Sequence, residues 1–185
     1  MNLLIQNARG AFLNIFEAKA FGGDPKAKAD FNGLFIITPQ HPAHKQLEKA
    51  FAEVAKEKWG PKSEGILKLL KQTDKTCLHN GDVKSSWDGF EGNFYISARS
   101  AVRPTVLNRD RSPITKEDGK AYSGAYYNVS IEIWAQDNKF GKRLNATLRG
   151  LQFVADGDAF SGGAAPADAD EFADLSVSDS ELENV

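Results

Sequence analysis

Arginine and aromatic side chains alternate through the second half of this 185-residue chain, from residue 95 to residue 143. Guanidinium and ammonium groups pair with phosphates, and aromatic rings stack on the faces of nucleobases. The two together predict a surface for single-stranded nucleic acid, on which each stacked base contributes about 1–3 kcal/mol with little sequence preference. The candidate residues are Tyr95, Arg99, Arg103, Arg109, Arg111, Tyr122, Tyr126, Trp134, Lys142 and Arg143.

Strand alternation predicts how these side chains lie. Successive residues of a strand point to opposite faces, so Tyr95 and Arg99 share one face of their predicted strand. Tyr126 and Trp134 likewise share one face of the next long strand. If these strands pair, their outer faces form an aromatic platform edged by guanidinium groups. The alternative, left open for the three rings, is that they fill the core of a barrel.

Charge is divided unevenly along the chain. Residues 150–185 contain nine acidic residues and neither Lys nor Arg, which gives this tail a charge of −9. Residues 1–149 contain all 23 basic residues and the other 16 acids, a net charge of +7, although the whole chain carries only −2. A cationic body joined to an anionic tail indicates a body that binds polyanions and a tail that imitates one.

The tail contains a motif of its own, DEFADL. Phe172 and Leu175 lie there among the acids Asp170, Glu171 and Asp174. A tail that serves only solubility needs no apolar residues, so this pattern predicts a docking peptide that orders on a basic partner surface. A solvated tail without a partner is the alternative.

Hydrophobic periodicity and turn residues predict the elements that position these side chains. The strands are expected at 11–21, 31–38, 93–102, 125–136 and 144–154, and the helices at 43–58 and 63–71. A mainly β chain with one or two helices inserted after the second or third strand is typical of a small Greek-key β-barrel such as the OB-fold.

Composition and length predict one folded domain and an appendage. From Ala155 onward small and acidic residues dominate, which predicts a domain over 1–159 and a flexible, disordered acidic tail over 160–185. The single Cys excludes an internal disulfide and fits a reducing compartment. The first residues lack the features of a signal peptide or membrane span, so we expect a cytoplasmic protein without membrane contact.

Catalytic and metal-binding patterns are weaker. Glu17 and the lysine two residues later match the end of a metal-dependent nuclease site, without an acidic residue upstream to complete it. Asp82 and Asp88 lie in turns, where Asp is common without a metal. Two short pairs of potential zinc ligands are separated by the predicted helices: His41, His44, Cys77 and His79. We therefore expect no enzyme activity, no cofactor and no metal.

Three segments resemble a bacteriophage family of single-stranded DNA-binding proteins: RPTVLNRDRSPIT, GKAYSGAYYNVSIEIWAQDN and NATLRGLQFVADGDAFSGG. The resemblance covers most of the body and the junction with the tail. It implies an OB-fold related to the replication single-strand binders of short-tailed phages, with an acidic C-terminal tail in which Phe172 is the expected aromatic anchor. It also implies a role for an arginine loop and the tyrosines after it: Arg103, Arg109, Arg111, Tyr122, Tyr126 and Tyr127.

The interpretation from the sequence is a protein that coats single-stranded DNA during phage replication, recombination or repair, in the cytoplasm of the infected bacterial host. The tail competes with DNA for the cationic surface and, when DNA displaces it, recruits phage or host replication proteins. Self-association into a homo-oligomer is left open, as is RNA binding. The alternatives are a divalent-metal nuclease acting on phage DNA and an interaction protein whose acidic tail mimics DNA.

Overall fold

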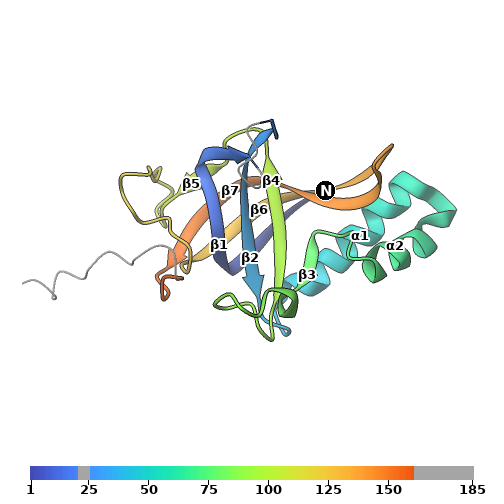
Figure 1. Ribbon diagram of the computed structural model, residues 1–185, viewed down its shortest axis with the longest axis horizontal. Helices are drawn as coiled ribbons and strands as arrows, with labels where there is room; N and C mark the ends of the chain where they lie inside the picture. Colours follow the sequence, from blue (N-terminus) through green and yellow to red (C-terminus); the bar gives the residue numbers. More distant parts are fainter. Residues whose placement is uncertain (21–25, 161–185) are drawn as a thin grey trace, which may run out of the picture.

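A computed structural model describes residues 1–20 and 26–160 (Figure 1). The strands are β1 (Asn2–Ala20), β2 (Ala29–Ile37), β3 (Leu78–Asn80), β4 (Phe94–Ser100), β5 (Thr105–Leu107), β6 (Tyr126–Asn138) and β7 (Gly141–Ala155). The helices are α1 (Ala43–Trp59) and α2 (Ser63–Gln72), joined by the 3-10 turn η2 (Gly60–Lys62), with a further 3-10 turn η3 (Gly81–Lys84). No helix within the described ranges is long and apolar enough to cross a membrane.

Five strands close a barrel. β1 pairs antiparallel with β2 and β6, β2 pairs with β4, and β6 pairs with β7. A parallel contact between β4 and β7 completes the ring, with Arg99 opposite Thr147. β3 extends the sheet beyond β4, and β5 extends it beyond β7. This is the Greek-key barrel of the OB-fold, so the predicted fold class is confirmed.

β1 is longer than predicted. It begins at Asn2 instead of near residue 11, and its first half pairs with β6 while its second half pairs with β2. A strand that bends from one neighbour to another loses strict alternation, and here Asn7 and Phe12 have φ values of 54° and 49°. The missed β3 and β5 contain three residues each, which is too short for a periodic signal.

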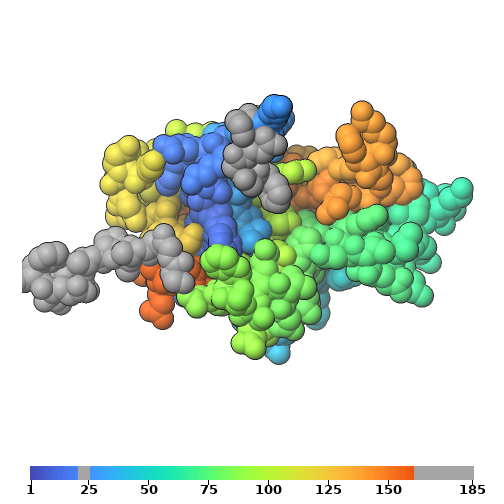
Figure 2. All heavy atoms as spheres, in the orientation of Figure 1, coloured from blue at the N-terminus to red at the C-terminus, as the bar shows by residue number. Residues whose placement is uncertain are grey.

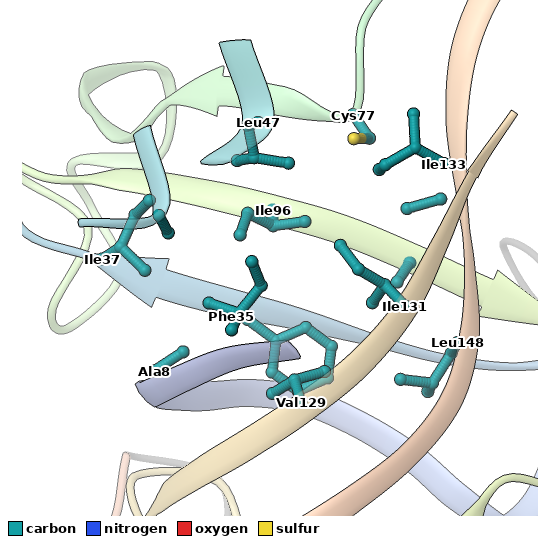
Figure 3. Close-up of a cluster of buried hydrophobic side chains, with 14 of the residues drawn as sticks. Ala8, Phe35, Ile37, Leu47, Cys77, Ile96, Val129, Ile131, Ile133 and Leu148 are labelled. Carbon is teal, nitrogen blue, oxygen red and sulfur yellow. The ribbon is translucent and has the colours of Figure 1, made fainter. Parts of the chain in front are cut away.

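The barrel interior is filled by every second residue of its strands (Figure 3). On β6, Val129, Ile131 and Ile133 are fully buried, whereas Glu132 and Trp134 on the opposite face are exposed, as the alternation predicts. Each fully buried Ile or Val of this kind stabilises the fold by about 1.5–3 kcal/mol relative to an exposed one. The packed interior holds the outer face of each strand in a fixed position.

Helix α1 closes one end of the barrel (Figure 1). Leu47, Ala50, Phe51 and Val54 recur at three- and four-residue spacing and belong to the same buried cluster as the barrel interior. The helix pair therefore caps the barrel, as predicted from this stripe. The loop between β5 and β6 lies at the opposite end of the molecule.

A β-bulge in β1 requires a glycine on the neighbouring strand. Between Ala11 and Asn14, β1 has two residues where β2 has only Gly33. Leu13 packs against the core, while Phe12 is 42% exposed. A Cβ on Gly33 would lie 2.9 Å from a methyl carbon of Leu13, so a side chain there would push Leu13 out of its place.

Substitution of Gly124, just before β6, tests how tightly residues 156–160 are held. It has a φ of +115°, and a Cβ there would lie 2.3 Å from the carbonyl oxygen of Asp158. We expect Gly124→Ala to lower the free energy of unfolding by about 2–4 kcal/mol, because backbone strain and overlap add. Gly119→Ala is the matched control: its φ is +66° with nothing within 4 Å, so only about 1 kcal/mol should be lost. Thermal unfolding measures both, and equal losses would contradict this account.

Candidate nucleic-acid interface

A groove of about 830 Å³ lies on the outer face of β2 and β4, between the β1–β2 end of the barrel and the β6–β7 hairpin. OB-folds bind oligonucleotides at this place, on the face of the second and third barrel strands between the first and last hairpin loops. The floor comes from outward-facing residues of β2 and β4, among them Asn32, Leu34, Ser97 and Arg99. The closure of β4 against β7 brings the hairpin to the edge of this floor.

The charged residues around this groove are mainly cationic. Lys19 comes from the end of β1, Lys28 from just before β2, Arg99 from β4 and Arg143 from β7, against the single acid Asp30. Cations that come from three strands and the β1–β2 connection and face one concave wall concentrate positive potential, because a low-dielectric cleft focuses the field. The groove is therefore a place of concentrated positive charge, even though the net charge of the chain is −2.

A second groove of about 650 Å³ continues from the first along the seam between β4 and β7. The two share Arg99 and Lys28, and the second extends to Trp134 on β6. Trp134 is 42% exposed, and Phe140 at the tip of the β6–β7 hairpin is 78% exposed. In Figure 2 this hairpin, in orange, stands out from the surface. The continuous surface formed by both grooves is called the cationic groove below.

Asp137 fixes the base of the hairpin. Its carboxylate accepts hydrogen bonds from Lys142 Nζ at 2.7 Å and from Trp59 Nε1 at 2.9 Å. Both donors, Lys142 more than Trp59, lower the pKa of the Asp137 carboxyl. The bond from Trp59 ties the hairpin to the end of α1, so the rigid helix cap supports one wall of the cationic groove.

The structure brings together only some of the residues that the sequence singled out. Arg99, Arg143 and Trp134 line the cationic groove. Lys142 is paired with Asp137 and is not a lining residue. The aromatic platform predicted from pairing of the two strands does not form, because β4 pairs with β2, β3 and β7 but not with β6 in the part of the chain that the structure describes. The outer rings therefore lie at separate places.

Tyr95 lies on the outer face of β4, as alternation predicts, but it is covered. The loop of residues 81–93 leaves it only 6% exposed, and its ring stacks on His79 with centroids 4.9 Å apart. The edge contact with Phe90 is 5.3 Å between centroids. Burial raises the pKa of the Tyr95 hydroxyl. The strand pattern thus gave the correct face, and only the tertiary structure shows that another segment covers it.

The arginine loop lies outside the cationic groove. Arg109 and Arg111 are exposed in the connection from β5 to β6, and Arg111 has a φ of 69°. The guanidinium of Arg103 lies 5.7 Å from the centre of the Phe16 ring. An ion pair of 2.7 Å between Lys116 and Glu17 ties this loop to β1. None of the three arginines is among the residues that line the cationic groove.

Two tyrosines anchor the segment after β7, residues 156–160, which is called the tail root below. The Tyr122 hydroxyl donates to Asp156 Oδ1 at 2.9 Å and accepts from the backbone N–H of Gly157 at 3.1 Å. The Tyr127 hydroxyl donates to the carbonyl oxygen of Tyr122 at 2.7 Å. Burial raises the pKa of Tyr122 and, more strongly, that of Tyr127. Tyr122 therefore contacts the tail root directly, and Tyr127 supports Tyr122.

Arg9, which the sequence analysis did not single out, completes this anchor. Its guanidinium donates to the carbonyl oxygens of Gly124 at 2.9 Å and Asp158 at 2.7 Å. The same group lies 4.2 Å from the centre of the Phe160 ring and 5.7 Å from that of Tyr126. Phe160 also packs against the buried cluster around Tyr95. The folded body therefore extends through Phe160.

Sequence reasoning passed over three contributors to the cationic groove. Lys19 and Lys28 flank the β1–β2 connection, and Phe140 lies in a tight turn beside Gly141. A large aromatic residue in a two-residue hairpin turn cannot be buried by its own strands, so the exposure of Phe140 could have been predicted from the sequence. No sequence pattern marks the two lysines as groove residues, because isolated Lys residues are common on any surface.

The residues of the nuclease alternative lie apart. Glu17 is paired with Lys116, which lowers the pKa of the Glu17 carboxyl. Asp82 Oδ1 accepts from the backbone N–H of Gly92 at 2.8 Å. Over residues 1–20 and 26–160, no three His, Cys, Asp or Glu side chains are grouped as a metal ion would require.

The four potential zinc ligands are likewise separate. His41 and His44 contact the backbone at the start of α1, where His41 Nδ1 accepts from Ala43 N–H at 3.0 Å. His79 contacts Asp74, while Cys77 is buried in the core cluster. Burial raises the pKa of the Cys77 thiol to about 12.

The fold and the cationic groove together define the class: an OB barrel with the surface that this fold uses for oligonucleotides. The model of the family described as the single-stranded DNA-binding protein of Enterobacter phage Enc34 matches residues 1–182. The chain belongs to this family of phage single-stranded DNA-binding proteins, and the resemblance found in the sequence is confirmed.

Individual relatives agree with this assignment. The chain is 39% identical over 183 residues to putative protein p50 of Acyrthosiphon pisum secondary endosymbiont phage 1, covering 98% of this chain and 97% of that protein. The structure is similar to that of the single-stranded DNA-binding protein from bacteriophage Enc34 in complex with ssDNA, with a TM-score of 0.69 and 22% identity over 85% of this chain and 88% of that one. For gp2.5, a single-stranded DNA-binding protein encoded by bacteriophage T7, the TM-score is 0.55 with 10% identity over 94% and 97%. At these identities the two structures establish the shared fold.

The buried Tyr127 hydroxyl predicts a loss of stability at high pH. Its pKa is raised in the folded protein, whereas tyrosines of an unfolded chain ionise near pH 10. Above about pH 10 the unfolded chain has released a proton that the folded protein keeps, so the free energy of unfolding falls as pH rises. We expect Tyr127→Phe to reduce this fall by up to about 1.4 kcal/mol per pH unit, measured by urea unfolding between pH 9 and 11. An unchanged alkaline slope would contradict the prediction.

Proposed function

We propose that this protein coats single-stranded DNA without sequence preference, with the strand lying in the cationic groove. The observation that carries this proposal is the convergence of four cations and two exposed aromatic rings on the oligonucleotide-binding face of the OB barrel. Membership of the phage single-stranded DNA-binding family supports it. A relative of the same fold, solved in complex with ssDNA, supports it further.

The groove suits single strands better than duplexes. Trp134 and Phe140 are exposed, and aromatic rings of this kind stack on bases that are free of a partner strand. Lys19, Lys28 and Arg143 supply charge that neutralises phosphates whatever the base sequence. We expect oligo(dT) to bind in preference to a duplex of equal length.

Replacing two groove arginines should weaken binding. We expect Arg99→Ala with Arg143→Ala to raise the Kd for oligo(dT) by about ten- to hundredfold near 50 mM salt. The slope of log Kd against log salt should fall by about 1.4, since each neutralised phosphate contributes about 0.7 on single strands. Fluorescence anisotropy titrations at several salt concentrations measure both. Lys45→Ala with Lys56→Ala, which removes two exposed charges from α1, is the matched control. Equal losses in the two double variants would reject the groove as the binding site.

The absence of catalysis is part of the proposal. Incubation of the protein with end-labelled single-stranded DNA and magnesium or manganese separates the alternatives, because a binder retards the DNA and a nuclease shortens it. Shortened DNA that persists in highly purified protein would favour the nuclease alternative.

We place this activity in phage replication, recombination or repair inside the infected host cell, where single strands arise. The acidic tail is proposed to compete with DNA for the cationic groove and, once displaced, to recruit phage or host replication proteins. Its docking motif, Asp170, Glu171, Phe172, Asp174 and Leu175, lies outside the described residues. Self-association also remains a prediction.

Chain length permits this competition. The tail root ends at Phe160, and the sequence continues for 25 residues beyond it. At most about 3.5 Å per residue, a chain of that length spans up to about 85 Å. That span exceeds the diameter of a small domain, so the segment is long enough for its acidic residues to reach the cationic groove from the tail root.

Truncation after Phe160 tests the competition and keeps the anchored tail root intact. We expect the truncated protein to bind oligo(dT) about three- to tenfold more tightly at 20 mM salt, with little difference at 300 mM, because salt screens the attraction between tail and groove. A full-length variant with the tail acids changed to Asn and Gln should match the truncated protein. Unchanged or weaker affinity at low salt would reject the competition and leave the groove assignment intact.

A further inference from the structure

Three side chains form a hydrogen-bonded chain that ends at the floor of the cationic groove. Asp74, in the turn after α2, has its Oδ1 2.7 Å from His79 Nδ1. His79, on β3, has its Nε2 2.9 Å from the hydroxyl oxygen of Ser97 on β4. Ser97 lines the cationic groove, two residues from Arg99 on the same outer face.

The imidazole ring is held firmly between these partners. The His79 side chain is only 11% exposed and stacks on Tyr95 at 4.9 Å with an interplanar angle of 27°. Asp74 reaches the ring from a turn in which its own φ is 53°, and its side chain is 66% exposed. A ring fixed on both nitrogens and on one face keeps its orientation when its protonation changes.

Hydrogen-bond chemistry assigns the direction of this chain. A carboxylate only accepts, so His79 Nδ1 carries the proton donated to Asp74. When the ring is neutral, Nε2 has no proton and accepts the hydroxyl proton of Ser97. When the ring is protonated, Nε2 donates to the Ser97 oxygen, and the hydroxyl proton is free to point into the groove. Protonation therefore turns Ser97 into a donor toward a groove ligand and adds a positive charge behind it.

The same order of groups occurs in hydrolases that use a serine nucleophile. Here the backbone N–H of Ser97 donates to the carbonyl oxygen of Cys77 at 2.9 Å, so it is not free to stabilise an oxyanion. Ser97 also lies in the middle of a paired strand instead of at a turn that exposes its hydroxyl. The local structure favours a binding contact over acyl transfer.

We propose that Ser97 is a phosphate-contact residue of the single-stranded DNA site, and that His79 and Asp74 set the direction of its hydrogen bond. This inference rests on the proposed function of the groove. Protonation of His79 favours donation from the Ser97 hydroxyl to an anionic phosphate oxygen, so the protein binds DNA more tightly at acidic than at alkaline pH.

The surrounding charges are consistent with this coupling. Asp74 faces the ring from the turn after α2, 2.7 Å from Nδ1. From β4, Tyr95 stacks on the His79 ring and Ser97 contacts its Nε2. Lys84 of η3 has its Nζ 6.0 Å from the centre of the Tyr95 ring. Cys77, whose pKa is about 12, stays a neutral thiol well below that pH.

The experiment measures the affinity of the full-length protein for oligo(dT) at pH 5.5 and pH 8 and compares the ratio of the two for each variant. For the unaltered protein we expect binding to be roughly three- to tenfold tighter at pH 5.5, the range of one charge-assisted hydrogen bond at a partly exposed site. The ratio should fall to near one in His79→Gln and to below half its value in Ser97→Ala. His44→Gln, which changes a histidine at the start of α1 outside the groove lining, should keep the full ratio.

Each outcome bears on the proposal. A ratio near one in the unaltered protein, or a full ratio in His79→Gln, would overturn it. A full ratio in Ser97→Ala would show that His79 acts by charge alone and would reject the hydroxyl relay. Should a variant misfold, NMR of the unaltered protein decides, because the titration midpoint of the His79 ring must rise when oligo(dT) binds. If the unaltered protein did not bind oligo(dT) at either pH, the proposed function itself would be rejected.

Discussion

The structure depends on one contact, the parallel pairing of β4 with β7. A barrel of five strands has no free edge between its first and last members once this pair forms, and the pair consists of a single register position, Arg99 opposite Thr147. The contact brings the outer face of β4 beside the base of the β6–β7 hairpin. The cationic groove exists only because this closure sets strand residues from the middle of the chain beside a hairpin near its end.

The packed interior holds the strands that form the groove in fixed positions. Inward residues of β1, β2, β4, β6 and β7 interlock with one face of α1 in a single buried cluster. With the inner faces fixed, the outer residues are held at strand spacing, which is suited to an extended ligand. Asp137 adds a tie between the hairpin and Trp59, so the wall of the groove is joined to the helix cap.

Aromatic residues are divided between two tasks. Trp134 and Phe140 are exposed beside cations. The hydroxyl of Tyr122 is hydrogen-bonded to the tail root, and that of Tyr127 to the segment before β6. Arg9 works with the second group, because its guanidinium donates to two backbone carbonyls there. Phe160, the last described residue, is therefore held against the body, and the sequence continues for 25 residues after it.

Sequence alone determined the mainly β fold, the helix insertion, the charge division and the inward and outward faces of β4 and β6, because these follow from local periodicity and composition. It also carried the family resemblance. It did not determine which outward residues stay open: Tyr95 has the same strand position as Arg99 but is covered by a loop. Nor did it place Lys19, Lys28 and Phe140 beside Arg99, or join Asp74 and His79 to Ser97. Only tertiary structure decides these contacts, because strand pairing and loop coverage join residues that no local pattern connects.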